Sequence, residues 1–149
     1  MRKVYISGLG QVPVAENWDK SLKELAGDAA LLAIQDADIG YPEALYVGNM
    51  MAISANRQAQ FGTMMSDWLG FHHKPGLAVE AACGSGAAAF RAALSAIASG
   101  EIESALVVGV EKMTDSPGAE ITSSLVTAAD TELEGDFGLS FVAINALIM

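Results

Sequence analysis

Short apolar runs alternate with helical stretches along this chain, and this alternation constrains the fold more than any other feature. The runs are rich in Val, Ile, Leu and Tyr, and they span residues 3–9, 45–48, 77–82 and 104–110. The helical stretches between them span residues 21–38, 56–69 and 84–99. Because parallel strands need a long crossover connection, this order predicts an α/β fold with a mostly parallel sheet covered by helices.

Two of the helical stretches have distinct signatures. Ser21 and Glu24 have the spacing of a capping box, which predicts a helix start there. The residues expected to face the sheet recur at intervals of three and four: Leu22, Leu25, Ala29, Leu32 and Ala33. The stretch 84–99 has Arg91 as its only charge, so we expect a central helix that is buried on nearly all sides.

The chain changes character after residue 110. Residues 111–138 contain scattered charges and no sustained apolar period, so we expect them to leave the sheet. Residues 139–149 are expected to be helical, and they end on Ala-Leu-Ile-Met without a capping residue. We therefore expect the polypeptide to continue beyond Met149.

Composition and charge exclude several classes of function. The 18 Asp and Glu residues outnumber the 8 Lys and Arg residues, and the formal charge of -10 disfavours nucleic acid and anionic membrane surfaces as partners. No apolar run has the roughly 18 residues of a membrane span. The apolar run near the N-terminus is too short for a signal peptide. We therefore expect a cytoplasmic protein with no membrane partner.

Cys83 is the only cysteine, and it stands between a predicted strand and a glycine-rich turn that opens a helix. The positive end of the helix dipole favours a thiolate there, and the Cys83 main-chain N–H is placed to donate to a developing oxyanion. Gly84 and Gly86 keep side chains away from an incoming acyl group. The alternative is an inert cysteine packed among small residues.

Metal ligands are scarce in this sequence. His72 and His73 are the only histidines, and they fall in an expected loop between Gly70 and Pro75. We assign them neither a catalytic nor a metal-binding role, and we expect no metal site.

The segment Ala82-Cys83-Gly84-Ser85-Gly86 resembles the nucleophile motif of the thiolase superfamily, most closely the archaeal and sterol-carrier-protein types. Segments 4–10, 48–59, 107–114 and 138–147 also resemble thiolase segments, in the same order and spacing. The resemblance implies the N-terminal half of a thiolase, with an α/β core over residues 1–114 and the start of an inserted loop domain over residues 115–149.

The resemblance also implies a function in lipid metabolism: an acyltransferase of the acetyl-CoA C-acetyltransferase type that makes or cleaves 3-oxoacyl-CoA. Cys83 is the implied nucleophile, with Gly84 and Met113 contacting the substrate and no cofactor besides the coenzyme A thioester itself. A homodimer or tetramer is expected through the edge strand Leu77–Ala82. The family's acid/base His and second Cys belong to its C-terminal half, so this chain alone is expected to have little turnover.

Two other functions remain open from the sequence. One is a condensing enzyme similar to ketoacyl synthases, which also place Cys at the start of a buried helix; the 56–59 turn and the 111–113 strand end favour thiolase. The other is a non-catalytic scaffold subunit of a thiolase complex, in which Cys83 is unreactive.

Overall fold

The computed structural model describes residues 2–149, and its centre is a parallel three-stranded sheet in the order β2-β1-β3. The strands are β1 (Ala44–Gly48), β2 (Gly76–Val79) and β3 (Ala105–Gly109). Leu45 of β1 is level with Gly76 on one side and Leu106 on the other. The parallel α/β fold predicted from the strand–helix alternation is therefore confirmed.

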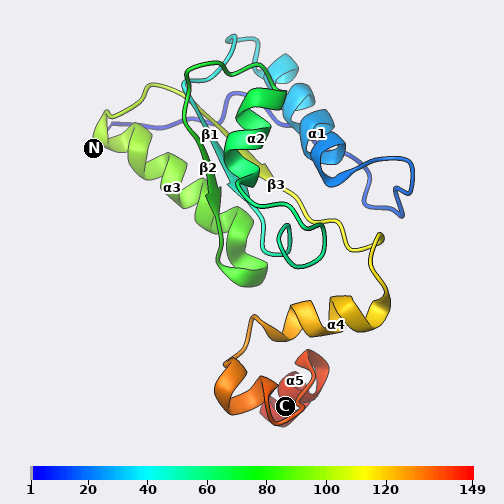
Figure 1. The fold of residues 1–149 in the computed structure, drawn as a ribbon. Coiled ribbons are helices and arrows are strands. Elements are labelled where there is room, and N and C mark those ends of the chain that lie inside the picture. The colour runs from blue at the N-terminus through cyan, green and yellow to red at the C-terminus, as the bar shows by residue number, and fades with distance from the viewer. Residues whose placement is uncertain (1) are drawn as a thin grey trace.

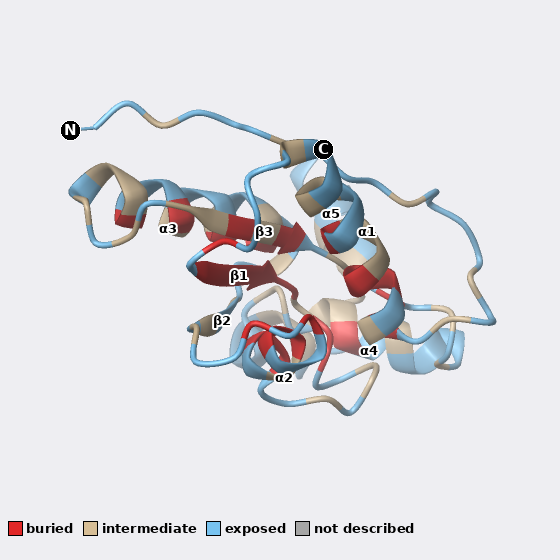
Figure 2. Cartoon of the chain, turned by 90° about the horizontal axis from the view of Figure 1, so that it is seen from above, coloured by how far each residue is buried: buried red, intermediate tan, exposed pale blue. Residues whose placement is uncertain are grey.

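Helices cover both faces of this sheet (Figures 1 and 2). α1 (Leu22–Ala37) and α2 (Phe61–Trp68) pack on one face, and α3 (Ser85–Ser99) packs on the other. Side chains alternate between the faces along β1, because successive residues of a strand point in opposite directions. Leu45 and Val47 face α1 and α2, whereas Tyr46 faces α3.

α1 begins and ends as its sequence predicts. The Ser21 hydroxyl accepts the Glu24 main-chain N–H at 3.2 Å, and the Glu24 carboxylate accepts the Ser21 N–H at 2.7 Å. The two residues thus form the expected capping box. Asp38 ends the helix in the left-handed conformation.

The buried stripe of α1 differs in part from the prediction. Leu22 and Leu25 are buried as expected, but Leu32 is 44% exposed. Ala26 and Ala30 lie against the sheet instead. The stripe follows the side of α1 that contacts α2 and β3, which the apolar spacing alone does not identify.

The predicted buried strand at residues 3–9 is wrong. This segment forms no strand, and the Tyr5 side chain is 79% exposed. It runs beside β3, and the two segments line a common cavity of about 510 Å³ instead of pairing. The Leu9 N–H donates to the Asp36 carboxylate instead, 2.9 Å away, so the segment is held against α1 rather than in the sheet.

The expectation that α3 is a central helix buried on nearly all sides is also wrong. Only the side of α3 that faces the sheet is buried, at Ser85, Ala89, Ala93 and Ala96. Phe90 and Leu94 are exposed, and they line the cavity that α3 shares with β3 and residues 4–10. The low charge of the helix indicated burial, but it does not tell which elements pack against each side of the helix.

The bounds of α2 and β3 differ from the prediction. α2 starts at Phe61 rather than near Asn56, because Arg57 and Gln60 adopt left-handed conformations that interrupt a helix. β3 is one residue shorter at each end than the predicted run 104–110. Its successive residues Leu106 and Val107 pack towards opposite faces, so helices cover both faces of this strand.

The chain leaves the sheet after β3, as expected, and Figure 1 shows this part beyond one end of the core. It contains α4 (Gly118–Val126), a π-helical turn (Thr131–Gly135) and α5 (Phe141–Ile148). α5 confirms the predicted C-terminal helix, whereas α4 had no clear period in the sequence. None of the helices in the described part of the chain is long and apolar enough to cross a bilayer.

Candidate functional site

The connection between β2 and α3 carries Cys83. β2 ends at Val79, three residues earlier than predicted, and a 3₁₀ turn over Ala82–Gly84 leads directly into Ser85, the first residue of α3. Cys83 lies within this turn and its side chain is exposed. The structure therefore places the thiol where the sequence predicted it, between a strand and a helix start.

This connection has an unusual backbone conformation. Ala82 has a φ of 47°, in the left-handed region that residues with a Cβ rarely adopt. The Ser85 hydroxyl accepts the Ala81 N–H at 2.9 Å and donates to the Ala82 carbonyl oxygen at 2.6 Å. The Glu80 carboxylate accepts the Ala82 N–H. These bonds replace the strand ladder, so β2 cannot continue to Ala82.

Two glycines beside the turn have different roles. A Cβ added to Gly48 would lie 2.5 Å from the Ser85 carbonyl oxygen and 2.6 Å from the Gly86 Cα, so the end of β1 packs directly against the start of α3. A Cβ added to Gly84 would meet nothing within 4 Å. The space beside Gly84 is therefore open.

Cys83 opens into a cavity of about 400 Å³. The cavity lies where β1 and β3 end, and α4 contributes one wall. Its lining residues are Gly48, Met50, Met51, Ala82, Cys83, Ser85, Gly86, Gly109, Val110, Glu111, Met113 and Leu125. The structure thus brings Met113 to the same cavity as Cys83, whereas the contribution of Leu125 was missed because α4 was not predicted.

Hydrogen bonds tie the two strand ends together around this cavity. The Glu111 carboxylate accepts the N–H groups of Met50 and Met51, the latter at 3.2 Å. The Asn49 side chain donates to the Val110 carbonyl oxygen at 2.8 Å and accepts the Ala52 N–H at 2.7 Å. The cavity wall is therefore fixed by side chains that link β1 to β3.

The sequence contained a signal for these two polar residues. Asn49 directly follows β1, and Glu111 follows the apolar run that becomes β3. Polar residues at the carboxyl ends of neighbouring parallel strands meet at one edge of the sheet, where α/β proteins place their sites. This rule identifies both positions without a structure.

Lys112 is a buried cation beside the same edge. Its ammonium group donates to the Asn17 carbonyl oxygen at 2.9 Å, the Thr114 hydroxyl at 2.8 Å and the Asp115 carboxylate at 2.6 Å. The side chain is only 2% exposed. It fastens the loop before α1 to the segment that leaves β3 and carries Met113.

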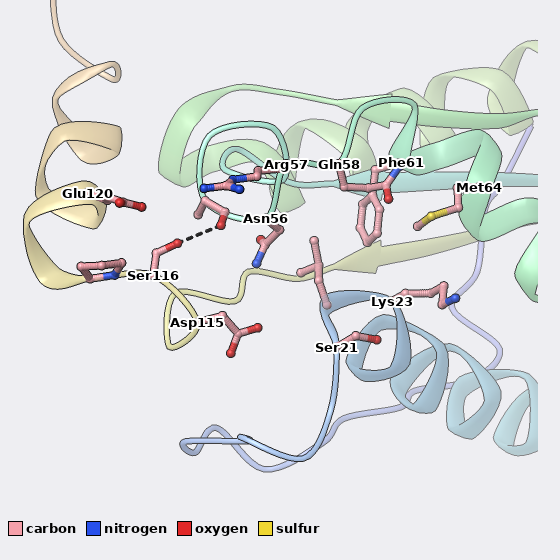
Figure 3. Close-up of a pocket in the computed structure, with 13 residues that line it drawn as sticks. Ser21, Lys23, Asn56, Arg57, Gln58, Phe61, Met64, Asp115, Ser116 and Glu120 are labelled. Atoms are coloured by element: carbon pink, nitrogen blue, oxygen red, sulfur yellow. Dashed lines mark hydrogen bonds between the residues drawn. The ribbon is translucent and has the colours of Figure 1, made fainter.

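A second hollow, a polar groove of about 600 Å³, lies away from Cys83 (Figure 3). Its walls come from the loop before α2, with Asn56 and Arg57, from the start of α1, and from the segment after β3, with Asp115, Ser116 and Glu120. The Ser116 hydroxyl donates to the Ala55 carbonyl oxygen at 2.9 Å, which joins the walls at one point. Because cationic and anionic side chains both line the groove, it has no single charge preference.

The histidines stay apart from both hollows. His72 and His73 are exposed in the loop between α2 and β2, as the sequence predicted. Within residues 2–149, no group of three His, Cys, Asp or Glu side chains is arranged to hold a metal ion.

Comparison with known proteins identifies the family. Residues 9–139 match the family described as thiolase, N-terminal domain. The chain is 37% identical to an acetyl-CoA acetyltransferase of Methanothermobacter thermautotrophicus, over 99% of this chain and 39% of that protein. It is 38% identical to an acetyl-CoA acetyltransferase of Methanocaldococcus jannaschii, over 99% of this chain and 38% of that protein.

The chain thus spans about two fifths of the length of these curated relatives. The family match covers most of the chain, including β1, β2, β3 and the turn with Cys83. The resemblance to the thiolase superfamily is therefore confirmed. This chain belongs to the thiolase family and contains its N-terminal domain.

Proposed function

We propose that this chain is the nucleophile-bearing part of a thiolase-type acyltransferase, in which Cys83 accepts an acyl group from an acyl-CoA thioester. One observation carries the proposal: Cys83 is exposed on a strained turn at the start of α3 and opens into a cavity of about 400 Å³. Active sites concentrate such backbone strain. The names of both relatives favour acetyl as the acyl group.

The proposed reaction begins with attack of the Cys83 thiolate on the thioester carbonyl carbon. The carbonyl oxygen becomes an oxyanion, which the Cys83 main-chain N–H stabilises. Collapse of this intermediate breaks the bond to the sulfur of coenzyme A, releases that thiolate and leaves acyl-Cys83. The enolate of a second thioester then attacks the acyl group and forms a 3-oxoacyl-CoA, and the cleavage direction is the reverse.

The cavity walls support this chemistry. Met50, Met113 and Leu125 line the cavity beside the thiol and offer apolar contacts to an acyl group. The open space beside Gly84 leaves room for the thioester. No metal or redox cofactor takes part in this scheme, and coenzyme A enters only as the thioester substrate.

We extend the proposal to the architecture of the whole protein. Residues 115–149 are proposed to begin a loop domain beside the nucleophile, which the contribution of Leu125 to the cavity supports. β2 is at the free edge of the sheet, so pairing with β2 of a second copy would join two sheets in a cytoplasmic dimer or tetramer. The acid/base groups are proposed to come from a C-terminal half.

Acetylation of Cys83 tests the proposal directly. The chain is incubated with acetyl-CoA, and the modified residue is located by peptide mass spectrometry. We expect one acetyl group on Cys83 and none on the variant Cys83→Ala. A Cys83 that remains unacetylated, or that also resists iodoacetamide under native conditions, would instead support the scaffold function.

Turnover tests the role of the missing acid/base groups. With acetyl-CoA alone, or with acetoacetyl-CoA plus coenzyme A, the chain is expected to show acetylation but little steady-state product. Robust turnover by this chain would contradict the proposal that proton transfer depends on a C-terminal half.

A further inference from the structure

We propose that Ser85 is a positioning residue for Cys83: its hydroxyl holds Ala82 in the left-handed conformation and so sets the direction of the Cys83 main-chain N–H. This inference rests on the proposed function, because it assumes that Cys83 is the nucleophile.

The contacts of Ser85 are directed at the turn. The side chain accepts the Ala81 N–H at 2.9 Å and donates to the Ala82 carbonyl oxygen at 2.6 Å. Ser85 is only 4% exposed, so water cannot readily replace these two bonds. The hydroxyl thus joins groups on both sides of the Ala82 φ and ψ angles, the strained part of the turn.

Ordinary helix capping does not explain this arrangement. The N-cap residue of α3 is Gly84, and no side chain caps the helix there. Ser85 is already helical, and its hydroxyl reaches back into the turn instead of accepting an N–H from α3. Ser99, at the other end of α3, makes only a local bond to the Ala96 carbonyl oxygen, 2.9 Å away.

The conformation of Ala82 determines the orientation of Cys83, the next residue. Acyl transfer needs both the sulfur and a correctly aimed N–H, because the thioester oxygen becomes an oxyanion. Alkylation by iodoacetamide needs only an accessible sulfur, since no oxyanion forms. Loss of the Ser85 hydroxyl should therefore slow acetylation more than alkylation, whereas general loosening of the fold should affect both in parallel.

The experiment measures the rate constants of Cys83 acetylation by acetyl-CoA and of Cys83 alkylation by iodoacetamide. We expect Ser85→Ala to lower the acetylation rate constant by about 10- to 100-fold. Its alkylation rate constant should change by less than about threefold, because the sulfur stays accessible. The control variant Ser99→Ala should match the wild type in both.

A second substitution tests the cause. Glycine adopts the left-handed region without strain, so Ala82→Gly should restore part of the acetylation rate in the Ser85→Ala background. Ala82→Gly alone is the reference against which the double variant is compared. If Ser85→Ala does not fold, the double variant tests the inference. The inference requires the double variant to fold and to be acetylated at nearly the rate of Ala82→Gly.

The outcomes separate the two proposals. If the wild type is never acetylated, the proposed function fails and the inference falls with it. If the wild type is acetylated and Ser85→Ala is equally fast, only the inference is overturned. It is also overturned if both rate constants fall in proportion, or if Ala82→Gly restores nothing.

Discussion

The Asn49 side chain donates a hydrogen bond to the Val110 carbonyl oxygen across 2.8 Å and thereby joins the C-terminal ends of β1 and β3. Its carbonyl oxygen also accepts the Ala52 N–H at 2.7 Å. Asn49 is almost fully buried, so its removal leaves polar main-chain groups without a partner.

Asn49→Ala should therefore lower the free energy of unfolding by about 1–3 kcal/mol. Urea denaturation followed by circular dichroism measures this change. Asn145→Ala is the matched control, since Asn145 is exposed on α5 and bonds only to the Phe141 carbonyl oxygen. The prediction is contradicted if both variants change stability by the same small amount.

Gly48→Ala should push the start of α3 away from β1. The added methyl group would lie 2.5 Å from the Ser85 carbonyl oxygen and 2.6 Å from the Gly86 Cα. Both are main-chain atoms, which cannot rotate away as a side chain can. We expect a loss of about 1–3 kcal/mol in stability, together with a changed alkylation rate of Cys83. Gly118→Ala, where an added Cβ meets nothing within 4 Å, should be close to neutral.

Tyr46 should make the fold less stable at alkaline pH. Burial raises the pKa of the Tyr46 phenol above its ordinary value of 10.0, and the negative charge of Glu101 adds to the effect. The unfolded chain therefore loses this proton at lower pH than the folded chain, so stability falls as the pH rises above about 10. The decline should be smaller in Tyr46→Phe.

Urea denaturation of the wild type and of Tyr46→Phe, at about pH 8 and at about pH 11, measures the Tyr46 contribution. Lysines titrate in the same range, so the difference between the two proteins is the informative quantity. Equal alkaline losses of stability in both would contradict the assignment to Tyr46.

Glu24 should have the opposite dependence at acid pH. The Ser21 main-chain N–H, and then the Ser21 hydroxyl, donate to the Glu24 carboxylate and lower its pKa below the ordinary value of 4.5. The stability that Glu24 contributes is therefore complete above about pH 4.5, and it is lost as the pH falls through the lower folded pKa. Thermal melting across this range should depend less on pH in Glu24→Gln.

Glu16→Gln provides the control for the acid range, because Glu16 is exposed and lies outside the capping box. Its melting temperature should follow the wild-type pH profile. A Glu24→Gln profile identical to that of Glu16→Gln would show that the capping box does not contribute in this way.

Features that depend on nearby residues could be predicted from the sequence. The capping box of Ser21 and Glu24 involves residues three apart, and the turn around Cys83 lies where its glycines predicted it, although its left-handed residue is Ala82. The three parallel strands also appeared at the expected places, because each is an apolar run bounded by breakers.

Features that depend on distant partners could not be predicted. Residues 3–9 have strand-like composition, but composition does not show that they line a cavity with β3 instead of pairing with it. The exposure of Phe90 on α3 could not be predicted for a similar reason, because burial depends on which elements pack nearby. The hydrogen bond from the Met50 N–H to the Glu111 carboxylate could not be predicted either, because it depends on the register between β1 and β3.

The placement of β1 between β2 and β3 also has a consequence for the folding pathway. Asn49 and Val110 are 61 positions apart in the sequence, so this contact closes a much longer loop, at a higher loop-closure entropy, than the contacts four residues apart within α1. Long-range pairing of this kind is slow compared with helix formation. We therefore expect the site around Cys83 to form late, because a nascent chain that has not reached Ala105 lacks the strand that completes its walls.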